Sequence, residues 1–455
     1  MARFENDLTE GSVTRKLVRF SLPFLMSNLL QSVYGATDLY IVSQFNGPES
    51  ISGVNLGTQL TFLILNIVFG LMTGGTVLVS QYLGAGRKKD VAEAIGTLFT
   101  VMGILAVFFT IVGLAFDDQL LNLINTPPEA FAEAKIYFRV CVWGLIFTFA
   151  YNAIAAVLRG MGDSKNPLIF VAIAAGVNIV LDVVFVYNLG MSAAGAAIAT
   201  VIAQALSVAI SIVYLIRSRF MFDFKLRSFK IYKEKLKLQL SLGLPASVQN
   251  SITSLSFLTM TALVNSYGVY ASTAVGIVAK LNGFAILPSM AMSSAVASMA
   301  GQNVGAGHFD RALKTMRVGR YLVLGVGVIL FALIQIFPAM FIKIFNSDPQ
   351  TVEYGVQYIR AFSLDYMIVP FAFCAHGLLS GSGRTLYIAA TSIICSLILR
   401  IPVAYLLSGP VGLGLAGVAL AVPVGSLGNY ALNIAYIMTG KWKRSKITGK
   451  DAVPN

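Results

Sequence analysis

Apolar residues in this chain form long stretches, and polar residues fall mainly between those stretches. A membrane-spanning helix needs about 20 mostly apolar residues, and about twelve stretches meet that length. They cover residues 17–45, 51–82, 92–116, 135–158, 167–187, 190–216, 238–267, 272–301, 313–342, 353–380, 386–407 and 411–439. The pattern therefore predicts an all-α integral membrane protein with twelve transmembrane helices.

The composition of the chain also indicates a membrane protein. Of the 455 residues, 56% are hydrophobic and 12% are charged, and the mean hydropathy is +0.77. A soluble globular domain has a much more polar composition. The three cysteines all fall inside apolar stretches and are too few and too scattered for a disulfide framework or a thiolate metal site. We expect them to be packing residues, and we predict no metal site.

Basic residues give the chain a net charge of +13 and cluster in the connections between alternate spans. The larger clusters lie at 87–89, 217–237 and 441–446. Lys and Arg are enriched on the cytoplasmic side of membrane proteins, which explains this distribution better than a nucleic-acid partner does. Both termini are therefore predicted to face the cytoplasm. The first span is too long for the core of a signal peptide, so we expect it to remain uncleaved.

Short motifs recur at a nearly fixed distance, which predicts an internal duplication. The pairs are Gln81–Gly86 with Gln302–Gly307 and Leu158–Gly162 with Leu379–Gly383, each 221 positions apart, and Ser21–Pro23 with Gly243–Pro245, 222 positions apart. Each half holds six predicted spans, an even number, so the two halves share one orientation. We expect two six-helix lobes related by a pseudo-two-fold axis along the membrane normal.

The duplication divides the chain into four predicted parts. They are an N-lobe at residues 1–216, a basic cytoplasmic linker at 217–237, a C-lobe at 238–440 and a cytoplasmic tail at 441–455. Membrane topology alone explains the basic linker, although an amphipathic helix on anionic lipid would carry similar charges. The glycines of the repeated Gly-Ala-Gly motifs are expected to permit tight turns between helices and not to bind a ligand.

A few ionisable side chains fall inside the predicted spans, where a charge costs ~2.5–3.5 kcal/mol and calls for a partner or a function. Asp38 lies in the first span and Asp182 in the fifth. Asn178 precedes Asp182 by four positions and shares its helical face, and Thr200 adds a hydroxyl from the sixth span. If Asp38 meets this face, two carboxylates share a dry pocket that can hold one proton or one small cation. Alternatively, both carboxylates only join helices by hydrogen bonds.

The second half carries different ionisable residues. Lys280, Asp365 and Arg400 suggest a charge-compensated cluster with a structural role, and His376 suggests a packing residue. No Gly-x-x-x-x-Gly-Lys-Ser/Thr motif is present to bind nucleotide phosphates, so ATP is not expected to drive the protein. Two histidines without an Asp-rich metal motif argue against a membrane-embedded enzyme.

Together these motifs resemble the multidrug and toxic compound extrusion (MATE) family. The resemblance covers nearly the whole chain. The motifs that carry it are Pro23 with Asp38, the two Gly-Ala-Gly motifs, Leu158–Asp163 running to Pro167, and Asn178 with Asp182. It implies two lobes in a V around a central cavity, and antiport of cationic or amphiphilic drugs against protons or sodium ions.

The resemblance also implies roles for single residues. Those that match the cation site of the family's N-lobe are Asp38, Asn178, Asp182 and Thr200. Those assigned to the substrate cavity are Tyr34, Tyr151, Gln249 and Asn250. Pro23 is expected to act as a hinge in the first helix. Because residues 249–256 contain no carboxylate, the chain is placed closer to the DinF-like and MepA-like branches than to NorM.

The sequence thus predicts an ion-coupled exporter of small cationic or amphiphilic molecules, not an enzyme, that needs no cofactor besides its coupling ion. That ion is expected to be H⁺, with Na⁺ as the alternative. We expect a multi-pass monomer among the lipids of a bacterial inner membrane. The alternative function is a flippase for a lipid-linked saccharide, because Lys280, Arg360 and Arg400 could meet a pyrophosphate. A strongly basic cavity would favour the flippase.

Overall fold

The computed structural model describes residues 6–45, 47–218, 220–445 and 447, and within these residues it contains helices and no strand. Arg219 of the predicted linker, and residues 446 and 448–455 of the predicted tail, lie outside the described residues. Contacts divide the chain into two compact units. The first consists mainly of residues 26–79 and 87–243, and the second of residues 7–25, 80–86 and the chain from 244 onward.

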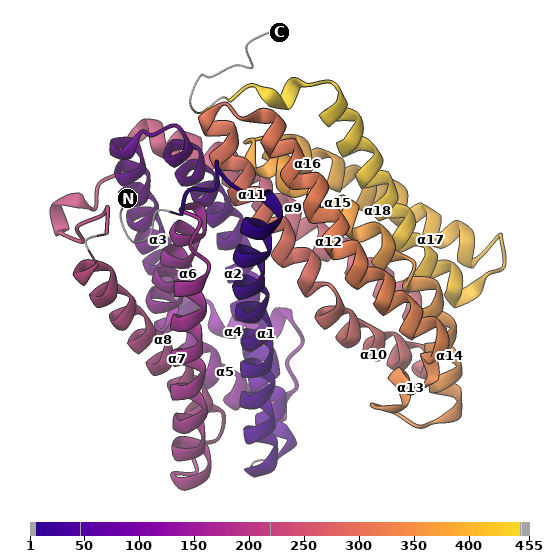
Figure 1. Cartoon of the computed structure of the whole chain (residues 1–455). Coiled ribbons are helices and arrows are strands. Elements are labelled where there is room, and N and C mark those ends of the chain that lie inside the picture. Colours follow the sequence, from indigo (N-terminus) through magenta and orange to yellow (C-terminus); the bar gives the residue numbers. More distant parts are fainter. Residues whose placement is uncertain (1–5, 46, 219, 446, 448–455) are drawn as a thin grey trace. The chain divides into compact units, whose positions relative to one another are not determined.

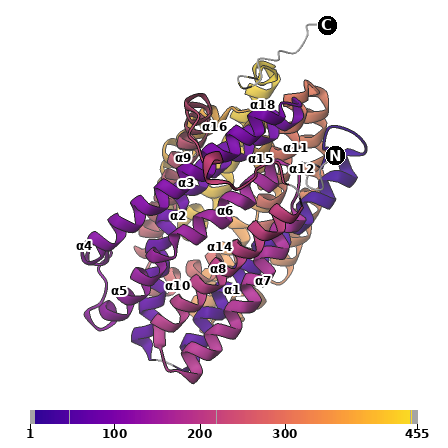
Figure 2. The same cartoon turned by 90° about the vertical axis from the view of Figure 1, so that its left-hand side faces the viewer.

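The first unit is a bundle of helices (Figures 1 and 2). Its elements are the larger parts of α1 (Val13–Phe45) and α2 (Pro48–Gly84), then α3 (Lys88–Ala115), α4 (Asp117–Leu123), α5 (Pro128–Trp143), α6 (Leu145–Gly160), α7 (Lys165–Asp182), the π-helical η1 (Val183–Asn188), α8 (Ser192–Arg217), the 3-10 turn η2 (Leu226–Ser228) and the start of α9 (Lys233–Asn265). Helix α8 packs against α5, α6 and α7, and α3 packs against α6. These contacts bring α7 and α8 side by side within the unit.

The second unit repeats this arrangement with the later helices. Its elements are the rest of α9, then α10 (Val269–Ala285), α11 (Leu287–Ala306), α12 (Phe309–Ile336), α13 (Pro338–Lys343), α14 (Pro349–Phe362), α15 (Asp365–Gly381), α16 (Thr385–Ile393), the π-helical η3 (Ile394–Arg400), α17 (Ile401–Ser408), α18 (Gly414–Met438) and the 3-10 turn η4 (Lys441–Lys443). Helices α11, α12 and α15 pack against one another, and α18 packs against α15 and α17.

The helices are long and apolar enough to cross a membrane. Among the described residues eight helices meet this condition, and ten do if each of two bent pairs forms one span. The bent pairs are α5 with α6, at 51°, and α14 with α15, at 43°. The remaining two predicted spans, 17–45 and 238–267, lie on α1 and α9, which do not meet this condition among the described residues. The prediction of an all-α membrane protein is confirmed.

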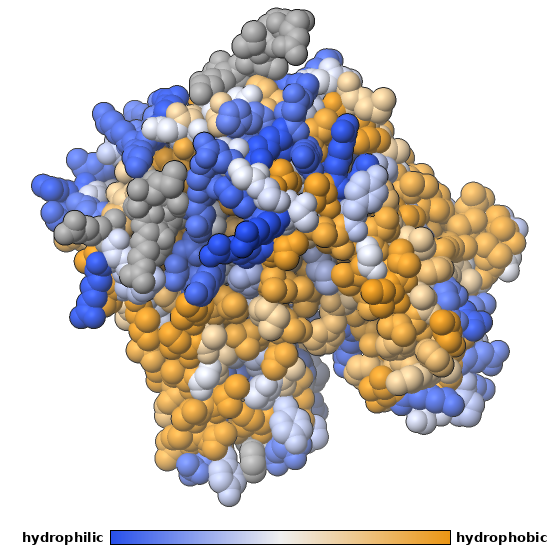
Figure 3. Space-filling model, in the orientation of Figure 1, coloured by the Kyte–Doolittle hydropathy of each residue, from blue (hydrophilic) through white to orange (hydrophobic). Residues whose placement is uncertain are grey.

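Side-chain exposure agrees with a lipid environment. On α3, Ile104, Val107, Phe108 and Ile111 are all more than half exposed, and their spacing places them on one helical face. In water such a stripe would be unfavourable, whereas lipid covers it without cost. On the face that Figure 3 shows, hydrophobic residues cover the middle of the helices in each unit, and hydrophilic residues gather toward the helix ends.

The duplication is visible in the backbone. Arg87 precedes α3 with φ −88° and ψ 67°, and His308, 221 positions later, precedes α12 with φ −88° and ψ 64°. Gly86 and Gly307, directly before them, have φ of 73° and 89°. Glycine adopts this left-handed region without a steric penalty. The last glycine of each Gly-Ala-Gly motif therefore permits a tight turn, as predicted.

The first glycine of each motif has another function, which the sequence did not reveal. A Cβ on Gly84 would lie 1.9 Å from the backbone oxygen of Gln302, and a Cβ on Gly305 would lie 2.0 Å from the backbone oxygen of Gln81. The end of α2 therefore crosses α11 with the two backbones in direct contact. The Gln81 side chain is fully buried there and donates to the Gly381 oxygen at 2.7 Å.

Replacing Gly84 or Gly305 by alanine is expected to lower the free energy of unfolding by at least ~2 kcal/mol, because the new Cβ would overlap a backbone oxygen that cannot rotate away. The measurement is the thermal unfolding midpoint of the purified protein in detergent. Gly103→Ala is the control, because a Cβ there meets nothing within 4 Å and alanine favours the helix. Equal midpoints for the variants at positions 84 and 103 would contradict the close approach.

Candidate functional site

A buried polar cluster lies inside the first unit, where three helices meet. Asp38 on α1 is 6% exposed, and Asn178 and Asp182 on α7 are fully buried. The two α7 residues are four positions apart, so the helix places both on one face. Thr200 on α8 completes the cluster. The structure thus brings together all four residues predicted to form the cation site.

Asn178 lies between the two carboxylates. In the orientation that satisfies both ends of its amide, its nitrogen donates to Asp38 Oδ1 at 2.7 Å and to Asp182 Oδ2 at 3.0 Å. Its oxygen then accepts from the backbone N–H of Thr200 at 3.3 Å. The Thr200 hydroxyl donates to Asp38 Oδ2, also at 3.3 Å. One amide and one hydroxyl therefore link α1, α7 and α8.

The cluster has more acceptors than donors. The Asp38 and Asp182 side chains adjoin each other, and among the described residues no donor reaches the buried Asp182 Oδ1. A buried acceptor without a donor is unfavourable, and two adjoining buried negative charges are more so. A proton shared by the carboxyl groups would remove both defects, and so would a small cation. The chemistry available to this site is thus the reversible binding of one positive charge.

Two residues beside the cluster were not predicted. Tyr137 and Cys141 on α5 are both buried and lie near Asp38 and Tyr34. The Tyr137 hydroxyl accepts from Thr58 at 3.2 Å. The four-residue spacing of Tyr137 and Cys141 places them on one face of α5, but nothing in the sequence indicates that this face turns toward α1.

The residues assigned to the substrate cavity do not gather at this cluster. Tyr34 lies beside Asp38, but the Tyr151 hydroxyl donates to the backbone oxygen of Pro167 at 3.3 Å, about three turns before Asn178 along α7. Gln249 and Asn250 lie half-buried on α9 in the second unit. Their role, like that of the expected central cavity, stays a prediction.

The ionisable residues of the second unit do not form the expected three-residue cluster. Asp365 and Arg400 are both buried, but Lys280 is exposed on α10 and forms no ion pair with either of them. The Arg400 guanidinium lies over the Phe257 ring, 4.7 Å from its centroid. His376 is half-buried in α15. The prediction was therefore wrong for Lys280, because the face of α10 that carries it is not covered.

Comparison with known proteins gives the family. A model of the MatE family matches residues 23–184 and, 222 positions later, residues 245–406. The chain belongs to the MatE family. The two matches begin at Pro23 and Pro245, so this MatE chain carries the family unit twice, in agreement with the duplication predicted from its motifs.

Relatives of this MatE protein match over nearly their whole length. It is 30% identical to the probable multidrug resistance protein YpnP of Bacillus subtilis, over 97% of this chain and 98% of that one. Identity is 26% to the probable multidrug resistance protein NorM of Thermotoga maritima, over 99% and 98%. The multidrug export protein MepA of Staphylococcus aureus (strain MSSA476) is 22% identical over 89% of each chain.

Solved structures confirm the fold of the MatE chain. The outward-facing structure of a multidrug resistance MATE family transporter of the MOP superfamily matches with a TM-score of 0.89 and 23% identity, over 96% of this chain and 98% of that one. The family match and the relatives confirm the predicted family and the coarse function of a membrane transporter, and the solved structure confirms the two-repeat fold. The predicted branch and the ion coupling stay predictions.

Replacing Asn178 by leucine is expected to lower the free energy of unfolding by ~1–3 kcal/mol, because two buried carboxylates lose their common donor. Adding Asp38→Asn should recover part of this loss, since a neutral amide does not need that donor. Thermal unfolding of the two single variants and the double variant measures the coupling. Asn152→Leu on α6 is the matched control and should be additive with Asp38→Asn. If the changes in unfolding free energy of Asn178→Leu and Asp38→Asn were also additive, Asn178 would not support Asp38.

Proposed function

We propose that this protein exports small cationic or amphiphilic organic molecules across a bacterial inner membrane in exchange for protons. The names of its relatives, which describe multidrug resistance and multidrug export, support the substrate class. The observation that carries the proposed coupling is the Asp38–Asp182 pair, buried and short of one donor. A site of this kind binds one positive charge and releases it again.

The binding of a proton changes the contacts of the cluster. A protonated carboxyl group becomes a donor, so it can satisfy Asp182 Oδ1, and Asn178 and Thr200 then no longer face two full negative charges. Because Asp38 is on α1 while Asn178 and Asp182 are on α7, this change alters the attachment of α1 to the bundle. Pro23 lies 15 positions before Asp38 within α1, and a proline removes a backbone hydrogen bond and weakens a helix locally.

We infer that α1 bends near Pro23 when the proton binds, which lowers the affinity for the drug and releases it outside. The helix returns when the proton leaves toward the cytoplasm. Each charge that crosses the membrane supplies ~2.3 kcal/mol per 100 mV, so ATP is not required. We further propose a monomer with both termini in the cytoplasm, as the distribution of basic residues favours.

The proposal is tested by the efflux of ethidium from proteoliposomes under an imposed proton gradient or an imposed sodium gradient. We expect the proton gradient alone to drive efflux in the wild type, and Asp38→Asn to abolish it, because an amide cannot take up the coupling proton. Asp310→Asn is the control, since this carboxylate is almost fully exposed.

Three outcomes would contradict the proposal. If only the sodium gradient drives efflux, the coupling ion is Na⁺ and not H⁺, and the Asp38–Asp182 pair remains the proposed site. Efflux that persists in Asp38→Asn would remove the coupling role of Asp38. If neither gradient moves ethidium and Asp38→Asn behaves as the wild type, the flippase for a lipid-linked saccharide becomes the leading account.

A further inference from the structure

The connector between the two repeats, the predicted linker at residues 217–237, packs against α3. Phe222 is 3% exposed and packs edge-on against Phe99 of α3, with the ring centroids 5.4 Å apart. A Cβ on Gly96 would lie 2.6 Å from the backbone oxygen of Ser228, so the connector touches the α3 backbone. The Tyr232 N–H donates to the Thr97 hydroxyl at 3.2 Å. The described part of the connector is therefore fixed to one helix of the first unit.

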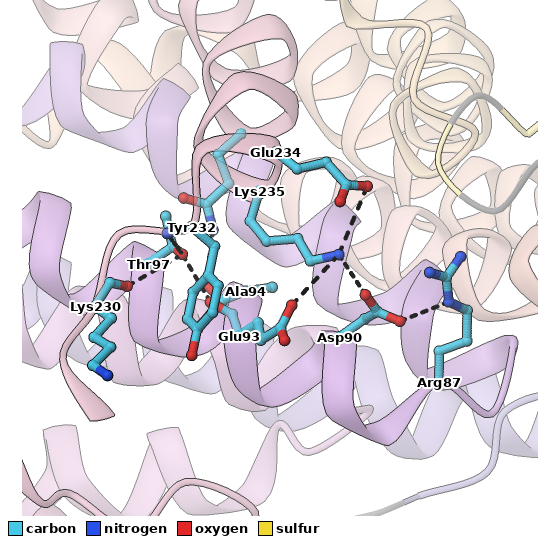
Figure 4. A network of polar contacts seen from close by, with 10 residues as sticks. Arg87, Asp90, Glu93, Ala94, Thr97, Lys230, Tyr232, Glu234 and Lys235 are labelled. Atoms are coloured by element: carbon cyan, nitrogen blue, oxygen red, sulfur yellow. Dashed lines mark hydrogen bonds and ion pairs between the residues drawn. The ribbon is translucent and has the colours of Figure 1, made fainter. Parts of the chain in front are cut away.

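A buried lysine continues this attachment into α9. Lys235, in the first turn of α9, is 2% exposed, and its ammonium group pairs with Asp90 and lies 3.8 Å from Glu93 (Figure 4). Arg87 also pairs with Asp90, at 2.7 Å. One turn further along α9, Gln239 donates to the Ala94 oxygen at 2.8 Å. Lysine is almost never buried without a partner, so this ion pair attaches the first turn of α9 to α3.

The second repeat contains an equivalent attachment for α1. Arg311 of α12 lies 221 positions after Asp90 of α3, the same distance that separates the repeated motifs. Its guanidinium donates to the backbone oxygens of Glu10, at 2.5 Å, and Gly11, at 2.8 Å. These residues directly precede α1, which begins at Val13. Asp90 in the first repeat thus holds the start of α9, the first helix of the second repeat. Arg311, at the equivalent position of the second repeat, holds the start of α1, the first helix of the first repeat. The two residues carry opposite charges.

Helices α1 and α9, the first helices of the two repeats, each pass from one compact unit to the other close to a proline. The start of α1 belongs to the second unit as far as Leu25, two residues after Pro23. The start of α9 belongs to the first unit as far as Gly243, two residues before Pro245. In both helices the anchored part and the remainder therefore belong to different compact units, and the change falls where proline weakens the helix.

We propose that Lys235 with Asp90, and Arg311 with the backbone at residues 10 and 11, are paired anchors that fix the starts of α9 and α1. The anchors confine bending to the Pro245 and Pro23 regions during transport. They act as positioning residues, because they touch neither the carboxylate pair nor the proposed substrate. The functional part of this inference rests on the proposed export activity, whereas the anchoring itself does not.

Hydrogen–deuterium exchange of the full-length protein tests the anchoring directly. In Lys235→Met, amides within Lys233–Gly243 should exchange at least about tenfold faster than in the wild type, because the ion pair that joins the first turn of α9 to Asp90 and Glu93 of α3 is lost. Amides within 246–265 should be unchanged. Lys235→Arg, which keeps the charge, should restore slow exchange, and Lys237→Met, an exposed neighbour on α9, is the matched control. Unchanged exchange in Lys235→Met would overturn the anchor.

The equivalent anchor allows an independent comparison. Arg311→Met should accelerate exchange at residues 8–17, whereas Lys314→Met, an exposed base one turn along α12, should not. An effect at Lys235 without one at Arg311 would overturn the pairing of the two anchors.

Ethidium efflux tests the role in transport. Lys235→Met should lower the maximal rate severalfold and leave the KM within about twofold, because the anchor acts on a conformational step and not on drug contacts. Lys235→Arg should restore the rate. Faster exchange with a wild-type rate would reduce the anchor to a stabilising contact and overturn the transport role. If the wild type moves no ethidium, the proposed function fails, and exchange alone decides whether the anchors exist.

Discussion

Two carboxylates inside a helix bundle that lies in lipid constrain the structure more than any other feature. Hydrocarbon offers no donors, so every donor to Asp38 and Asp182 must come from the protein. The amide of Asn178 can serve both carboxylates only if α1, α7 and α8 meet at one level, with Thr200 behind the amide. The packing of the first unit is therefore tied to the chemistry of this cluster.

The two repeats keep the same backbone and differ in charge. Turns and crossings use glycine in both halves, because a turn at positive φ or a contact between two backbones admits little else. Charged positions have diverged. Arg400, a buried guanidinium, lies within one position of the residue that corresponds to the neutral amide of Asn178. The two repeats thus share one backbone arrangement but bury different charges, and among the described residues the buried carboxylate pair lies in the first repeat.

Much of this architecture could be predicted from the sequence, because hydrophobic length fixes where a helix crosses a membrane and a helical period fixes which residues share a face. The shared face of Asn178 and Asp182 followed from their spacing alone. The sequence did not reveal the bends at Gly144 and before Asp365, nor that Tyr137 faces Asp38, since both depend on packing between helices. In the sequence Lys235 is one of several lysines in the predicted linker, and nothing in this lysine-rich segment indicates which of them is buried.

The crossing of α2 with α11 has a consequence for the history of the chain. Gly84 touches Gln302 while Gly305 touches Gln81, and such exchange of partners is the mark of an isologous interface, in which two identical surfaces meet about a two-fold axis. A pair of separate six-helix chains would form the same contact, and every substitution would then appear in it twice. When the two copies are joined into one polypeptide, a substitution in one copy no longer appears in the other. Equivalent positions can then carry different side chains, as Asp90 and Arg311 do.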